Sequence, residues 1–197
     1  MYRVIGTLHS RAFRVLWMLE ELGQPYEQIA AMPQSAEART HYPHGKIPVL
    51  IDCEAVLSDS TAILTYLADK HGALTAPPGS LERARQDAMT QRILDEFDSL
   101  LWTAAKHSFV LPEERRVASI KDALKWEFAR SEAALVRDMG ESNFVAGDSL
   151  SIPDIVLTHC LGWAITAKFG ISEPKLSDYL DRMRKRDTYL RTREKSA

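Results

Sequence analysis

The side chains best suited to chemistry gather in the first 60 residues. Ser10 precedes an apolar series at helical spacing from Val15 to Leu22, so it is expected at the N-terminus of a helix that Gly23 and Pro25 end. Unpaired N–H groups and a partial positive charge at such an end stabilise anions, including a thiolate, and the serine hydroxyl could add one hydrogen bond. A serine before a helix also serves simply as a cap, so this feature alone does not define a site.

Two further segments carry groups that recognise a peptide. In Gly45-Lys-Ile-Pro-Val49 a proline opens a strand, and a cis Ile47–Pro48 bond would turn the Ile47 backbone toward an extended peptide that pairs with it. Asp59-Ser60 opens a second helix, where the serine and the first free N–H groups could hold a carboxylate. The Asp59 carboxylate could pair with an ammonium group. A trans proline and an ordinary helix cap are the plain alternatives.

The elements that must position these residues follow a recognisable order. Tyr2 to Thr7 and Tyr26 to Ala30 are expected strands on either side of the first helix, and 47–51 with 55–57 form a hairpin around a tight turn. The second amphipathic helix follows from Ser58. This β-α-β, loop, β-β-α order predicts a thioredoxin-like N-terminal domain.

The rest of the chain is expected to be helical. The Pro/Gly cluster at 76–80 marks a linker, which gives a thioredoxin-like domain at 1–76, a linker at 77–82 and an all-helical, bundle-like domain at 83–197. The expected helices share apolar residues at helical spacing and cover 81–109, 113–139, 152–168 and 176–191. The basic stretch from Arg182 to Lys195 is interpreted as a solvated helix end.

Composition limits the possible partners. The net charge of −2 gives no reason to expect nucleic acid or an acidic membrane, and no apolar run approaches the roughly 18 residues of a membrane span. Two distant cysteines, Cys53 and Cys160, and the lack of a signal peptide favour a cytoplasmic protein.

His41 and His44 form the only close histidine pair, and with no further ligand nearby we expect no metal.

Taken together, three runs resemble the N-terminal domain of soluble glutathione transferases. They are Ser10 to Gly23, Gly45 to Leu50 and Asp59 to Ile63, and Gly147 to Ile155 resembles the capping element of that family's C-terminal domain. In this element Ser151 caps a helix while Asp154 reaches back to its N–H. The resemblance covers essentially the whole chain. It implies an enzyme that binds glutathione, activates its thiol and works as a homodimer.

The resemblance also implies roles for individual residues. Ile47 and Pro48 would pair with the cysteinyl backbone of glutathione, Ser60 would hold its γ-glutamyl carboxylate and Asp59 would lie near its amine. Lys46 could approach the glycyl carboxylate.

The residue that contacts the thiolate is left open among three neighbours. Ser10 is favoured because its spacing to Arg14 matches the serine-type, bacterial-like members, and His9 and Thr7 are the alternatives. The run from Ser10 to Phe13 occupies the place of the Cys-x-x-Cys motif of thioredoxins, so dithiol exchange by that route is excluded.

The second substrate is expected near Trp102, His107 and Phe109, although the two aromatic rings could equally serve packing. The reaction implied is detoxifying attack on an electrophilic small molecule, with peroxide reduction as a further activity. A non-catalytic interaction module and a glutathione-dependent isomerase or dehalogenase are the competing hypotheses.

Overall fold

A computed structural model describes residues 1–195. The chain forms two compact units, Met1–Ser80 together with the stretch from Arg184, and Leu81–Met183. The first unit contains four strands: β1 (Tyr2–Ile5), β2 (Tyr26–Ile29), β3 (Val49–Asp52) and β4 (Ala55–Ser58). Its helices are α1 (Ala12–Glu21), α2 (Ala36–His41), α3 (Ser60–His71) and α9 (Asp187–Glu194).

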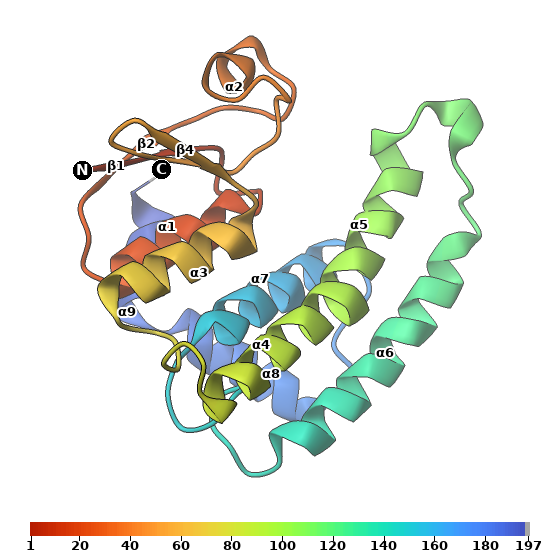
Figure 1. Ribbon diagram of the computed structural model, residues 1–197. Helices are drawn as coiled ribbons and strands as arrows, with labels where there is room; N and C mark the ends of the chain where they lie inside the picture. Colours follow the sequence, from red (N-terminus) through yellow and green to blue (C-terminus); the bar gives the residue numbers. More distant parts are fainter. Residues whose placement is uncertain (196–197) are drawn as a thin grey trace. The chain divides into compact units, whose positions relative to one another are not determined.

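The strands form one sheet in the order β2-β1-β3-β4. β1 and β2 are parallel, whereas β1–β3 and β3–β4 are antiparallel. In Figure 1, α1 and α3 lie side by side on one face of this sheet and α2 lies on the other. Alternation of side chains along the strands explains this, because Val4 and Leu50 share one face while Ile5, Val49 and Ile51 share the opposite one. The thioredoxin-like arrangement is confirmed.

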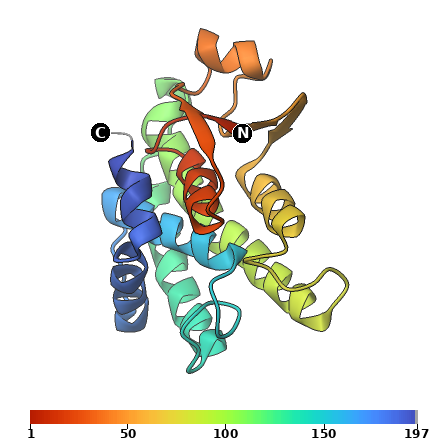
Figure 2. The ribbon, with the colours of Figure 1, turned by 90° about the vertical axis from the view of Figure 1, so that its left-hand side faces the viewer.

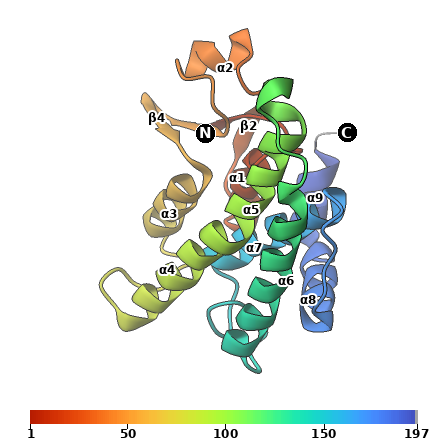
Figure 3. The same cartoon turned by 90° about the vertical axis from the view of Figure 1, so that its right-hand side faces the viewer.

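The regular elements of the second unit are all helices or helical turns. Its elements are α4 (Leu81–Ile93), η1 (Leu94–Asp98), α5 (Ser99–Ala105), η2 (Lys106–Val110), η3 (Glu113–Arg115), α6 (Ile120–Met139), α7 (Ile152–Thr166) and α8 (Pro174–Arg184). The expected helix over 81–109 is one column in which η1 and η2 are π-helical turns. Figure 3 shows α6 running alongside this column. None of the helices within residues 1–195 combines the length and apolar character needed to cross a bilayer.

Two expected helix boundaries are wrong. The helix predicted from Glu113 starts at Ile120, because 113–115 form a single 3-10 turn and Val117 is half exposed, so no apolar face exists before Ile120. The helix predicted over 176–191 is interrupted at Lys185–Arg186 and forms α8 and α9.

The C-terminal boundary of the helical domain also differs from the expected 83–197. From Arg184 onward the chain belongs to the first unit, where α9 packs against α1 (Figure 2). The ring of Tyr189 lies 5.0 Å from that of Phe13 and 5.2 Å from that of Trp17, both in edge-to-face contact. The stretch therefore includes a helix that packs through Tyr189, while the basic side chains of Lys185, Arg191 and Arg193 remain exposed as expected.

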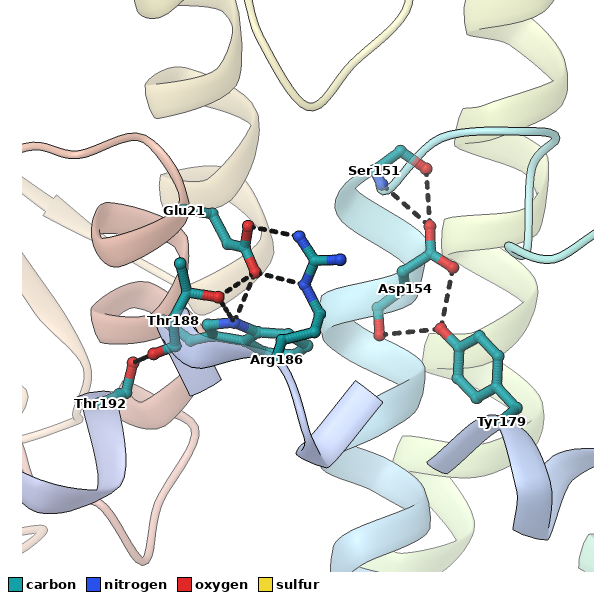
Figure 4. A network of polar contacts seen from close by, with 8 residues as sticks. Glu21, Ser151, Asp154, Tyr179, Arg186, Thr188 and Thr192 are labelled. Atoms are coloured by element: carbon teal, nitrogen blue, oxygen red, sulfur yellow. Dashed lines mark hydrogen bonds and ion pairs between the residues drawn. The ribbon is translucent and has the colours of Figure 1, made fainter. Parts of the chain in front are cut away.

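The predicted capping element is confirmed in the second unit. Asp154, which is fully buried, accepts a hydrogen bond from the Ser151 N–H at 2.9 Å, as Figure 4 shows. The same carboxylate accepts from the Ser151 hydroxyl at 3.0 Å and from the Tyr179 hydroxyl at 2.8 Å. This element fixes the start of α7.

Candidate functional site

Three segments meet at one end of the sheet. Ile5 ends β1 and pairs with Val49 at the start of β3, and Val49 pairs in turn with Ser58 at the end of β4. The residues just beyond this row are therefore the loop after β1, the Ile47–Pro48 segment and the Asp59–Ser60 segment. Strands lie about 4.8 Å apart, so the row is roughly 10 Å wide. That is about the length of an extended tripeptide.

The segment before β3 offers an open backbone edge. The Ile47–Pro48 peptide bond is cis. Neither the N–H nor the C=O of Ile47 is hydrogen-bonded to another backbone group among the described residues, so both remain available to an added strand. Gly45 allows the backbone of this segment to lie close to that of Gln34. Its φ is 63°, and a Cβ there would lie 3.1 Å from the Gln34 Cα. Lys46 is exposed beside this edge.

The start of α3 has an unusual backbone at Asp59. This residue has φ 71° and ψ 122°, a conformation that costs a non-glycine residue about 1–3 kcal/mol and that concentrates at functional sites. Its Oδ1 accepts from the Thr61 N–H at 2.9 Å and from the Ala62 N–H at 3.0 Å. Both of these bonds use Oδ1, so Oδ2 of this exposed side chain remains available to a cationic group. Ser60 follows, 2% exposed.

A buried arginine supports Ser60. Arg14 lies on α1 with no exposed surface, and its Nη1 donates to the Ser60 Oγ at 3.3 Å. Because the Ser60 oxygen accepts this bond, its own hydroxyl proton can be donated elsewhere. In the sequence alone, Arg14 is notable only for its spacing to Ser10. The signal that could have revealed it is a single cation on the buried face of an otherwise apolar helix, where a charge needs a partner.

Ser10 lies one residue outside its expected position. The N-cap of α1 is Arg11, and the Ser10 hydroxyl donates to the Thr7 carbonyl at 2.7 Å while accepting from the Ala12 N–H at 3.1 Å. A tight turn before the helix causes this shift, since the Ser10 N–H also donates to the Thr7 carbonyl at 3.1 Å. His9 is exposed in the same turn. All three candidates for the thiolate contact are thus brought together before α1.

The residues predicted for the second substrate belong to the second unit. Trp102 is on α5 and 39% exposed, and Phe109 is on η2 and 70% exposed. His107, between them in sequence, accepts from the Val117 N–H through Nδ1 at 3.1 Å. The six residues predicted to bind glutathione or its thiol all lie in the first unit.

The histidine pair forms no metal set. His41 lies 3.0 Å from the Glu37 carboxylate, and the His44 ring packs against Tyr42. Neither belongs to a group of three or more metal-ligating side chains within residues 1–195.

Comparisons with known proteins agree with this geometry. Residues 8–78 match the family model for the glutathione S-transferase N-terminal domain. The chain is 30% identical over 156 residues to glutathione S-transferase GstB of Escherichia coli K12, which covers 73% of each protein. The glutathione S-transferase of a sphingomonad, solved in complex with glutathione, superposes with a TM-score of 0.83 at 25% identity, covering 98% of both chains. A glutathione transferase of Methylococcus capsulatus shares the fold at a TM-score of 0.87 and 22% identity, covering 100% of this chain and 98% of that one. The chain belongs to the glutathione S-transferase family.

Proposed function

We propose that this protein is a glutathione transferase that holds glutathione across the end of its sheet and activates the thiol for attack on an electrophilic small molecule. The observation that carries the proposal is the convergence of an open backbone edge and two helix N-termini on one row of paired residues, Ile5, Val49 and Ser58. The width of this row suits a tripeptide whose ends are charged and whose centre carries sulfur.

Each part of glutathione has a matching group in the first unit. The cysteinyl backbone pairs with the N–H and C=O of Ile47. The γ-glutamyl carboxylate takes the hydroxyl proton of Ser60, whose oxygen is held by Arg14. The γ-glutamyl ammonium lies near the Asp59 carboxylate, and the exposed Lys46 attracts the glycyl carboxylate.

The thiolate is stabilised at the start of α1. Lowering a thiol pKa from about 8.5 to about 6.5 takes roughly 2.7 kcal/mol. One hydrogen bond to a charged group, about 1.5–3 kcal/mol, together with the helix terminus supplies this. Ser10 is our first choice as donor, and its hydroxyl would turn from the Thr7 carbonyl to the sulfur. His9 and Thr7 are the alternative donors.

The proposal extends to the partners. Trp102, His107 and Phe109 contact the second substrate, which is an electrophilic carbon compound or a peroxide. The protein is a serine-type member of the family and acts in the cytoplasm as a homodimer. Cys53 and Cys160, which are not joined in a disulfide, are consistent with that compartment.

Two serine substitutions test the site. Ser60→Ala is expected to weaken glutathione binding about 10- to 100-fold in calorimetric titration, because it removes a charge-assisted hydrogen bond. Ser10→Ala is expected to leave binding nearly intact and to raise the pKa of the bound thiol, followed by thiolate absorbance. Ser149→Ala, at an exposed position in the second unit, is the matched control. Wild-type protein that fails to bind millimolar glutathione would overturn the proposal.

One observation favours a second candidate function. The Ser10 hydroxyl proton is already engaged by the Thr7 carbonyl, as expected for a site that retains glutathione without ionising it. Such a protein would be an interaction module without turnover. Tight binding with an unshifted thiol pKa in wild type would support this candidate. A lowered pKa without conjugation of chlorodinitrobenzene would instead direct the search to isomerase and dehalogenase substrates.

A further inference from the structure

Three metal-ligating side chains meet in the second unit, outside the residues assigned to glutathione. Asp98 is the last residue of η1, and His159 and Cys160 are consecutive on α7. One ligand atom from each of the three lies within 4.8 Å of the other two. The Cys160 thiol donates to Asp98 Oδ2 over 3.9 Å.

The fold brings these groups together and covers them. α7 packs directly against the α4–η1 column, so Asp98 faces Cys160, 62 positions away in sequence. A π-turn such as η1 inserts an extra residue per turn and re-aims its side chains, which is why such turns occur often at functional sites. Asp98 is 7% exposed, Cys160 is fully buried and His159 is half-buried. The half-buried imidazole gives an ion a route from solvent.

The donor set selects one class of cation. Carboxylate oxygen, imidazole nitrogen and thiolate sulfur together suit zinc, whereas calcium and magnesium take oxygen ligands. Tetrahedral zinc with bonds of about 2.0 Å to oxygen and 2.3 Å to sulfur places these two atoms roughly 3.5 Å apart. The observed separation of 3.9 Å is close to that value.

Charge balance points the same way. A thiolate and a carboxylate carry two negative charges, which the two positive charges of Zn²⁺ neutralise, so the loaded site has no net charge to bury. We propose that Asp98, His159 and Cys160 bind Zn²⁺, with water as the fourth ligand. On binding, the Cys160 S–H bond breaks, its proton leaves to solvent and its electron pair forms the sulfur–zinc bond. His159 contributes a neutral ring nitrogen. The competing explanation is a hydrogen-bonded cluster that only joins η1 to α7.

Cobalt substitution of the full-length, chelator-treated protein tests the site. Co²⁺ is expected to bind one equivalent and to give a thiolate-to-cobalt absorption band that added Zn²⁺ abolishes. Cys160→Ser should remove the band, and His159→Gln and Asp98→Asn should weaken Co²⁺ binding on the order of tenfold or more. Cys53→Ser is the matched control, because it removes the exposed cysteine of the first unit and should keep the band.

The outcomes separate this proposal from the previous one. Absence of the band in wild type, or its persistence in Cys160→Ser, would overturn the zinc site whatever the protein does with glutathione. His159→Gln, at the half-buried position, keeps the test decisive should Cys160→Ser not fold. Unchanged glutathione binding by a variant that has lost the band would show that the first unit is intact and that the lost property is the metal site itself.

Discussion

The Asp154 side chain is fully buried and its carboxylate accepts four hydrogen bonds. Its Oδ2 accepts from the N–H and hydroxyl of Ser151, and its Oδ1 accepts from the Val145 N–H and the Tyr179 hydroxyl, both at 2.8 Å. Burial raises the pKa of the Asp154 carboxyl, and the four donors oppose that rise. The pKa of Tyr179 is raised by its own burial and by the neighbouring carboxylate. One buried acid therefore satisfies donors from the loop that precedes α7 and from α8.

Replacing this acid should be costly. Asp154→Ala leaves several buried donors without an acceptor and is expected to lower the free energy of unfolding by about 3–5 kcal/mol. Asp154→Asn, which keeps one oxygen, should lose less. Urea denaturation measures both, with exposed Asp148→Ala as a control that should stay within about 0.5 kcal/mol of wild type. Equal stability of the Asp154→Ala and Asp148→Ala proteins would contradict the role assigned to Asp154.

At the scale of elements, α9 is held to α1 by a buried carboxylate. Figure 4 shows Glu21 facing Arg186 and Thr188, and Arg186 donates to it through Nε at 2.7 Å and Nη2 at 2.8 Å. The Trp17 indole and the Thr188 hydroxyl donate to it as well. Burial alone would raise the pKa of Glu21, but the bonds from Arg186, Thr188 and Trp17 outweigh it, and the net pKa is lowered.

The sign of this shift fixes a pH dependence. A carboxylate with a lowered pKa in the folded state stabilises it above the ordinary value of 4.5, and the stabilisation is lost as pH falls through the folded pKa. Glu21→Gln is expected to cost about 1–2 kcal/mol at pH 7 and progressively less below pH 4.5. Urea denaturation midpoints at pH 7 and at a pH below 4.5 measure this difference, with Glu27→Gln at an exposed position as the control. A difference that persists unchanged at low pH would show that charge is not what binds α9.

The same elements show what sequence patterns can and cannot reveal. The sheet order, the hairpin and the Ser151–Asp154 cap follow from local signals, namely apolar periodicity, turn residues and capping spacing. The attachment of α9 to α1 depends on pairing Glu21 with Arg186, a contact that no local pattern contains. Likewise Arg14 beneath Ser60 and Asp98 beside Cys160 come from distant segments. Such contacts decide the geometry of both candidate sites.

At the scale of the molecule, the helical unit is inserted into the sequence of the first unit. A chain that stops after Lys185 lacks α9 and would expose the rings of Phe13 and Trp17 that Tyr189 covers. We expect this truncation to destabilise the first unit by about 3 kcal/mol or more. Amide hydrogen exchange should then accelerate in α1 and β2 and stay slow in α7. Equal acceleration of exchange in both units would mean that they unfold together. Tyr189→Ala should also accelerate exchange in α1 and β2, but by less than the truncation.

The late position of α9 also bears on how the protein is made. A nascent chain emerges from the ribosome from its N-terminal end, so the sheet and α1 are synthesised well before the helix that covers them. At roughly 5–20 residues per second, the intervening helical unit takes on the order of 5–20 s to translate. During that interval the rings of Phe13 and Trp17 lack the cover that Tyr189 later provides.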